Sequence, residues 1–244
     1  MKKIILAAVM IISILLMLAA YGNDLEIATK REPRAQDDNK VEKYKVISKK
    51  YEKKMIRISY PMISGLGDKD KEYRINKLIE DNALKIIDFY GKEKSIDIKI
   101  AYEVKLQNSE TLSIVYSGVG NVPNTAYPTN HFYTTNIDIV NGRVLKLSDL
   151  VQVDESLVSM LKSDAFILIN DAGITKEVIN NMYNNILLDS LKNADEIDKI
   201  GTIEQPDTFS YLTEDSLGIS IGVSHAAGDH LEFEVDYNKI KLLR

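Results

Sequence analysis

Apolar and polar residues alternate along much of the middle of the chain. The clearest case is SIDIKIAYEVKLQN, residues 95–108, in which every second residue from Ile96 to Leu106 is apolar. Side chains of a strand point alternately to its two faces, so this period of two predicts a strand with one buried face. The same alternation predicts two strands between residues 44 and 63, one at 111–119 and three after residue 206.

Two other segments have the spacing of amphipathic helices. DKDKEYRINKLIEDNALKIIDFY, residues 68–90, places apolar residues three or four positions apart, with Asp68 as a candidate cap and Gly91 as its end. Residues 154–200 return to helical spacing. Because strands come in runs and helices in blocks, the order predicts an α+β fold with antiparallel sheets packed with helices, rather than alternating βαβ units.

The α+β region is expected to form two closely joined subdomains, an N-terminal one at residues 41–120 and a C-terminal one at residues 121–244. Near the start of the second, HFYTTNIDIV and RVLKLSDL flank the pair Asn141 and Gly142. This pair predicts a hairpin with a tight type I′ turn, because asparagine and glycine adopt the positive φ angles that such a turn requires.

The first 20 residues show no regular alternation of apolar and polar positions. Lys2 and Lys3 precede an apolar run of 17 residues, Ile4 to Ala20, which is the pattern of a secretory signal peptide. We therefore predict a signal peptide at residues 1–22 and a charged, flexible tether at residues 23–40. The run is also just long enough to span a bilayer, so an uncleaved N-terminal membrane anchor is the alternative.

Tyr21 stands where a bacterial lipoprotein has its lipidated cysteine, and the chain contains no cysteine. The absence of thiols excludes lipid attachment through sulfur, disulfides, a thiolate nucleophile and thiolate metal sites. We expect an exported protein, at the outer face of the cytoplasmic membrane, in the cell wall or secreted.

The charge balance bears on the partners. With 31 basic and 36 acidic residues the net charge is −5, which argues against nucleic acid as a partner. Basic residues nevertheless gather between residues 41 and 57. Two interpretations of them stay open at this point: contact with an anionic wall polymer or lipid headgroups, or a solvated strand face.

The strongest candidate for binding is the loop NVPNTAYPTNHFYTT, residues 121–135. It brings Tyr127, His131, Phe132 and Tyr133 together beside two prolines and several short polar residues. This composition suits stacking on sugar rings or contact with a protein partner. The alternative is that Phe132 faces the core while the tyrosines line a sheet edge.

A weaker candidate is SHAAGDH, residues 224–230, in which His225, Asp229 and His230 could offer three ligands to zinc. The spacing is not that of a helical ligand pair, and Gly228 indicates a turn, so solvated turn residues are the simpler interpretation. The sequence has no nucleophile elbow and no phosphate-binding loop. We expect no cofactor.

Several stretches resemble a known pair of domains. ISYPMISGLGDKDKEYRIN, residues 58–76, is similar to the opening of a small extracytoplasmic domain of firmicute proteins, in which a strand ending in Tyr-Pro runs into a helix bearing Ile-Asn. Three later stretches resemble its companion domain: AYPTNHFYTTNIDIVNGRVLKLSDLV, DTFSYLTEDSLGISIGVSHAAG and EFEVDYNKIKLL. The resemblance covers nearly all of residues 44–243.

In better-known relatives this pair of domains of unknown function forms the outer part of RsiV-type lysozyme-sensing anti-sigma factors and the non-catalytic part of PdaC-type peptidoglycan deacetylases. The resemblance implies a membrane-associated or secreted binding module for a cell-wall glycan or a wall-acting protein such as lysozyme. A metal-dependent hydrolase that modifies the wall is the alternative.

Three features depart from those relatives. Many of them have a histidine where this chain has Tyr127, only three residues precede the apolar run, and the deacetylase's metal-binding domain has no counterpart here. We therefore expect neither the anti-sigma role nor the deacetylase activity.

Overall fold

The computed structural model describes residues 43–91, 95–169 and 176–243. The predicted signal peptide at 1–22, Tyr21 and the predicted tether at 23–40 lie outside these residues. Within them, no helix is both long enough and apolar enough to cross a membrane.

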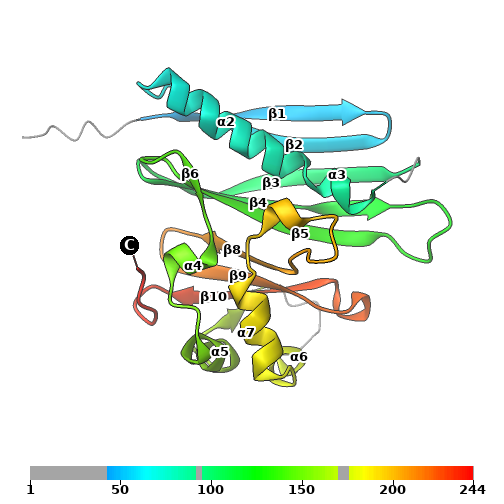
Figure 1. Cartoon of the computed structure of the whole chain (residues 1–244), viewed down its shortest axis with the longest axis vertical. Coiled ribbons are helices and arrows are strands. Elements are labelled where there is room, and N and C mark those ends of the chain that lie inside the picture. The colour runs from blue at the N-terminus through cyan, green and yellow to red at the C-terminus, as the bar shows by residue number, and fades with distance from the viewer. Residues whose placement is uncertain (1–42, 92–94, 170–175, 244) are drawn as a thin grey trace, which may run out of the picture. The chain divides into compact units, whose positions relative to one another are not determined.

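The first half of the described chain forms a six-stranded sheet with the order β1-β2-β3-β4-β5-β6 (Figure 1). Its strands are β1 (Lys45–Lys53), β2 (Ile56–Ser64), β3 (Asp97–Gln107), β4 (Thr111–Asn121), β5 (Thr129–Asp138) and β6 (Arg143–Leu145). All neighbours are antiparallel except β2 and β3, which pair in parallel over three residues each. The connection between these two strands is helical, through α2 (Lys69–Leu84) and α3 (Ile86–Phe89).

Helix α2 covers one face of this sheet (Figure 1). Its apolar side chains Ile75, Ile79 and Ala83 are fully buried and lie four residues apart, on one face of the helix. They pack into a core with the inward-facing residues of the strands, among them Ile58 and Ile100. The alternating positions of β3 therefore supply the floor on which α2 lies.

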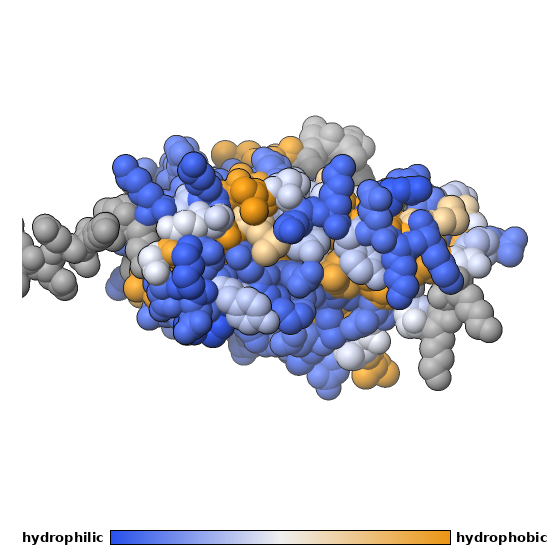
Figure 2. All heavy atoms as spheres, turned by 90° about the horizontal axis from the view of Figure 1, so that it is seen from above, coloured by the Kyte–Doolittle hydropathy of each residue, from blue (hydrophilic) through white to orange (hydrophobic). Residues whose placement is uncertain are grey.

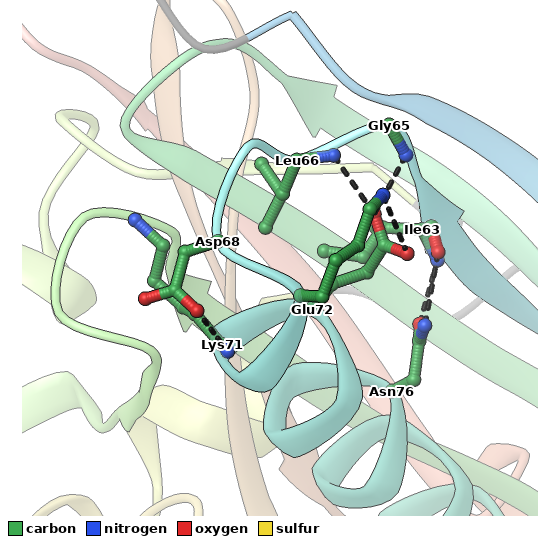
Figure 3. Close-up of polar contacts among 8 residues, drawn as sticks. Ile63, Gly65, Leu66, Asp68, Lys71, Glu72 and Asn76 are labelled. Carbon is green, nitrogen blue, oxygen red and sulfur yellow. Dashed lines mark hydrogen bonds and ion pairs between the residues drawn. The ribbon is translucent and has the colours of Figure 1, made fainter.

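Polar side chains fix the start of α2 to the end of β2 (Figure 3). The carboxylate of Asp68 caps the helix by accepting a hydrogen bond of 2.9 Å from the backbone N–H of Lys71. One carboxylate oxygen of Glu72 accepts from the backbone N–H groups of Gly65 and Leu66, at 2.7 and 2.8 Å. The turn between strand and helix is thus held by side chains from the helix itself.

One turn later, Asn76 takes the place of a neighbouring strand (Figure 3). Its side-chain amide accepts a hydrogen bond of 2.7 Å from the backbone N–H of Ile63 and donates one of 2.9 Å to the Ile63 carbonyl. The pairing of β2 with β3 ends at Ile58, so Asn76 satisfies backbone groups that β3 does not reach. This gives the Ile-Asn pair of the resemblance a physical meaning, since Ile75 enters the core while Asn76 holds the strand.

The second half of the chain forms a four-stranded antiparallel sheet with the order β7-β10-β9-β8. Its strands are β7 (Ile167–Leu168), β8 (Thr208–Leu212), β9 (Ser216–Gly222) and β10 (His230–Asp236). The helices of this half are α4 (Leu147–Leu150), α5 (Glu155–Lys162), α6 (Glu177–Asn180) and α7 (Asn184–Lys192). The two sheets face each other between α2 on one side and α5 to α7 on the other (Figure 1).

The sheets meet through buried polar side chains. Asn136 of β5 donates a hydrogen bond of 2.9 Å to the Ser210 carbonyl in β8. It also accepts one of 2.7 Å from the hydroxyl of Ser113, whose oxygen in turn accepts from the Leu212 N–H at 2.9 Å. Each of these polar groups has a partner on the facing sheet or on the neighbouring strand of its own sheet, as burial requires.

Asp195 extends this network from the loop between α7 and the short helix η1 (Ile197–Lys199). Its carboxylate accepts hydrogen bonds from the backbone N–H and the hydroxyl of Ser210, from the Leu147 N–H and from the Thr134 hydroxyl, at 2.6 to 3.3 Å. Burial raises the pKa of Asp195 to about 6, and these donors act in the opposite direction. One carboxylate thereby connects β5, β8 and the start of α4.

The α+β prediction is confirmed, and within the described residues β2 and β3 form the parallel pair among otherwise antiparallel strands. The predicted subdomain boundary at residues 120 and 121 coincides with the end of β4, whose partner β5 continues the same sheet. Of the buried side chains that form the two cores, those up to Ile139 belong to the first, and those from Leu145 onward belong to the second, except Ile197, Ile200 and Phe209, which join the first.

The Asn141 and Gly142 pair lies in the turn of the β5–β6 hairpin, but the prediction of a type I′ turn is wrong. Asp138 pairs with Arg143, so four residues make the turn, and among them only Gly142 has a positive φ, 64°. The Asp138 carboxylate accepts hydrogen bonds from the backbone and side-chain amides of Asn141, at 2.9 and 2.8 Å. A side chain before the turn therefore sets its shape.

Candidate functional site

The residues proposed for sugar binding and those proposed for metal binding meet at one place. The loop between β4 and β5 and the loop between β9 and β10 lie at the same end of the two sheets (Figure 1). The backbone N–H of Asn130 donates a hydrogen bond of 2.9 Å to Asp229 across 99 residues of sequence. Two candidates that the sequence presents separately thus form a single site.

Tyr127 and His225 form the outer part of this site. Their rings lie 5.1 Å apart at an angle of 31°, and Tyr127 is 68% exposed. His225 belongs to the short helix η2 (His225–Ala227), and its Nδ1 lies 3.0 Å from both carboxylate oxygens of Asp229. Asp229 therefore holds the histidine ring beside the tyrosine and ties both to β5.

His230 has other neighbours than His225. Gly228 and Asp229 have φ angles of 94° and 73°, and this left-handed turn starts β10 in a new direction. The His230 ring packs on Phe132 at 4.8 Å, and its Nε2 lies 3.4 Å from a carboxylate oxygen of Glu232. Among the described residues no three His, Cys, Asp or Glu side chains are grouped so as to hold a metal ion. The three-ligand arrangement considered for His225, Asp229 and His230 is corrected accordingly.

Tyr133 and His131 point to the opposite face of β5 from Phe132, as alternation along a strand requires. Tyr133 is 1% exposed, stacks on Tyr116 at 4.8 Å and donates a hydrogen bond of 2.7 Å to the Ala83 carbonyl. Tyr133 is therefore a core residue, and of the predicted aromatic cluster only Tyr127 presents its ring to solvent. Phe132 is half-buried between the two sheets.

His131 forms the inner wall of the site together with Tyr90. Its Nε2 and the Tyr90 hydroxyl share a hydrogen bond of 2.6 Å. Burial lowers the pKa of His131 to about 4 and raises that of Tyr90 to about 12, so both are neutral at neutral pH. A Cβ on Gly120 would lie 1.7 Å from the Tyr90 oxygen and 2.9 Å from Nε2 of His131, so only glycine fits beside this pair.

Between these walls lies a cavity of about 200 Å³. Its apolar lining includes the rings of Phe89, Phe132 and Phe209, and its polar lining includes Gln205, Asp207, Ser220, Asp229 and His230. Pockets for drug-sized ligands occupy roughly 300 to 1,000 Å³, so this cavity matches a single ring-sized group. Mixed aromatic and polar walls provide stacking together with hydrogen bonds.

Two parts of the cavity lining could not be predicted from the sequence. Phe89 ends the helical segment, where its apolar spacing indicates core packing alone. Gln205, Pro206 and Asp207 come from the loop before β8 and lie more than 70 residues from Phe132 in sequence. No local pattern connects such residues, because the stacking of the two sheets alone brings them together.

No protein-family model and no curated protein matches the chain. Among the solved structures similar to it are two bacterial proteins. One is a member of the DUF3298 family from Bacteroides fragilis, with 14% identity and a TM-score of 0.46, covering 80% of this chain and 90% of that one. The other is a DUF3298 family protein from Pseudomonas aeruginosa PAO1, with 11% identity and a TM-score of 0.45, covering 82% and 94%.

Proposed function

We propose that the protein is an exported, envelope-facing binding module that recognises a cell-wall glycan and performs no catalysis itself. One observation carries the proposal: the exposed Tyr127 ring, held against His225, stands next to a cavity with aromatic and polar walls. Asp229 joins the two parts, since it contacts His225 and also lines the cavity.

A sugar ring suits this arrangement for chemical reasons. Its apolar C–H face stacks on an aromatic ring, while its hydroxyls donate to carboxylates and exchange hydrogen bonds with amides. Tyr127 offers the ring, and Gln205, Asp207 and Asp229 offer the polar groups. A cavity of about 200 Å³ takes one sugar residue of a chain and leaves its neighbours to the surface around Tyr127.

Export is part of the proposal because the apolar run at Ile4 to Ala20 has the pattern of a signal peptide. The resemblance to outer domains of wall-related firmicute proteins supports the same placement. The rival hydrolase lacks support, since within the described residues His225, Asp229 and His230 do not form a group that could hold a metal ion.

The test is a pull-down of the purified protein on insoluble peptidoglycan, with Tyr127→Ala as the main variant. Loss of a central aromatic contact typically costs 2 kcal/mol or more, so we expect retention to fall about 30-fold or more. Tyr183→Ala is the matched control, because Tyr183 is also exposed but lies before α7, away from the cavity.

A parallel arm uses immobilised lysozyme. The proposal is supported if the protein is retained on peptidoglycan, if Tyr127→Ala reduces this retention, and if Tyr183→Ala leaves it unchanged. Retention on lysozyme alone replaces the glycan with a wall-acting protein as the partner. Release of soluble wall fragments by the purified protein, lost in His225→Ala, overturns the non-catalytic reading.

A further inference from the structure

The hairpin of β1 and β2 carries positive charge that the remainder of the chain does not. Residues 43–57 contain seven basic side chains and one acidic side chain, a net charge of +6. Residues 58–244 contain 18 basic and 29 acidic side chains, a net charge of −11. Charge separated this strongly within one chain indicates a surface for an anionic partner.

Most of this charge is not neutralised by neighbouring side chains. Arg57 lies 3.9 Å from Asp97 and is compensated. The other six basic residues are lysines, all exposed, and none of them has an ion pair in the described part of the chain. They are Lys43, Lys45, Lys49, Lys50, Lys53 and Lys54.

Exposed apolar side chains lie among these lysines. On one face of β1, Ile47 stands between Lys45 and Lys49, and Ile47 is exposed. Met55, in the turn after Lys53, is 52% exposed. The view from above, onto β1 and α2, shows a mostly hydrophilic surface with hydrophobic groups scattered in it (Figure 2).

This combination distinguishes between anionic partners. A soluble polyanion attracts the lysines but gains nothing from exposed Ile47 and Met55. The headgroup region of a bilayer attracts the lysines to its phosphates and also accepts apolar side chains at the boundary of the acyl chains.

The position of the hairpin in the chain favours the same partner. Twenty residues separate Gly22 from Lys43, and a chain of that length spans at most about 70 Å when fully extended. A protein held by its N-terminal apolar run therefore keeps this hairpin within reach of the membrane surface.

We propose that the β1–β2 hairpin docks on an anionic lipid bilayer, with its lysines at the headgroup phosphates and Met55 at the interface. β1 is the edge strand of its sheet, so no described strand covers its outer side. Lysines on an edge strand also discourage pairing with a strand of another molecule. That role does not explain Lys54 and Met55, which lie in the turn and not on the edge. This docking does not depend on the glycan site, which other loops form.

The absence of cysteine allows a local test in the full chain. Met55→Cys carries an environment-sensitive fluorophore at the hairpin, and Ile203→Cys carries the same label at a fully exposed position in the loop before β8. Each protein is mixed with vesicles of phosphatidylglycerol and phosphatidylcholine in equal parts, with vesicles of phosphatidylcholine alone, and with soluble polyphosphate. Because the label reports only its surroundings, insertion of the N-terminal run does not produce the signal.

We expect a blue shift at position 55 with the anionic vesicles only, reversed by 1 M salt, where the Debye length is about 3 Å. Each lysine contributes roughly fivefold to binding at an anionic surface, so replacing Lys45, Lys49 and Lys53 with glutamine should weaken it about 100-fold. Arginine at the same positions should restore it.

The control replaces three exposed lysines elsewhere, Lys192, Lys239 and Lys241, with glutamine and so changes the net charge equally. It should leave the shift at position 55 intact. Four results would each overturn the proposal. They are an equal shift with neutral vesicles, a shift with polyphosphate but not with vesicles, an equal loss in the control variant, and no shift at all.

Discussion

The two faces of the six-stranded sheet are both buried, but by different chemistry. The face toward α2 is covered with Ile58, Ile98, Ile100 and other apolar residues that need no specific partner. The face toward the second sheet buries Thr134, Asn136 and other polar groups, each held by directed hydrogen bonds. On the first face, the buried apolar area provides the stability. On the second face, the geometry of the hydrogen bonds fixes the position of the facing sheet.

The difference shows what each face tolerates. An apolar face accepts changes of shape that keep its volume, because burial is not directional. A hydrogen-bonded face fails when one partner is removed, because the remaining groups stay buried without partners. Four experiments can break or sharpen this contrast.

The largest effect is expected from Ile100→Asp on the α2 face. Ile100 is 4% exposed, and a carboxylate there has no partner, so we expect a loss of about 4 kcal/mol or more in the free energy of unfolding. Urea denaturation measures it, with Ile100→Val as the control at about 1 kcal/mol. Equal stabilities of the aspartate and valine variants would show that this face is not a dry core.

The second experiment uses one titrating group on each face. Asp195, toward the second sheet, has its pKa raised from 3.8 to about 6, so the native state binds more protons than the unfolded state between these values. Its contribution to stability therefore falls by about 3 kcal/mol as pH rises through this range. His131, toward α2 and α3, has its pKa lowered from 6.5 to about 4, so its contribution rises by about 3 kcal/mol over nearly the same range.

In the wild type these two trends oppose each other. We expect Asp195→Asn to make the free energy of unfolding rise from about pH 4 to pH 7 relative to the wild type, and His131→Gln to make it fall. Urea titrations at several pH values measure both. Slopes of the same sign in the two variants would contradict this assignment.

The third experiment breaks only the polar face. Asn136→Ala leaves the Ser210 carbonyl without its donor and the Ser113 hydroxyl without its acceptor, and we expect a loss of about 2 kcal/mol. Asn238→Ala is the exposed control and should change stability by less than about 0.5 kcal/mol. Similar losses in both variants would mean that the network contributes little.

The smallest effect is expected at the edge of the apolar face, where Asn76 completes the hydrogen bonds of β2. Asn76→Ala should cost about 1 kcal/mol, since water can reach part of this site. Hydrogen exchange offers the sharper measurement: the Ile63 amide should lose protection while the amides of β4 keep theirs. Unchanged protection of the Ile63 amide in this variant would show that Asn76 does not hold the backbone of β2.

This contrast also explains what sequence analysis predicts well. Alternation predicts β3 and helical spacing predicts α2, because both elements divide into apolar and polar sides. On β5 the same rule misleads: Thr134, Asn136 and Asp138 alternate like solvent-facing residues, yet all three are buried. Thr134 and Asn136 are held by Asp195 and Ser210, more than 60 residues away in the sequence. Asp138 is held by Asn141 in the turn that follows it.

The candidate site follows the same logic. Composition identifies Tyr127 as an exposed ring, but it also includes Tyr133. Tyr127 lies in the loop before β5, whereas Tyr133 lies within β5 and points into the core. The two histidines near Asp229 are close in sequence but pack on different rings, His225 on Tyr127 and His230 on Phe132. Phe89 and Gln205 have no signal of their own, since their role arises from the packing of the two sheets.

The polar inner face has a consequence for the order in which the protein assembles. The contacts of Glu72 and Asn76 with the end of β2 close loops of 6 to 13 residues, whereas those of Asn136 and Ser113 with β8 span 74 and 99 residues. Loop-closure entropy favours the short loops by about 2 kcal/mol, so we expect the first sheet and α2 to form while β8 is still being synthesised. During that interval the sheet presents Thr134 and Asn136 to water. An apolar surface would promote aggregation at this stage, whereas a hydrated polar surface can await its partner in solution.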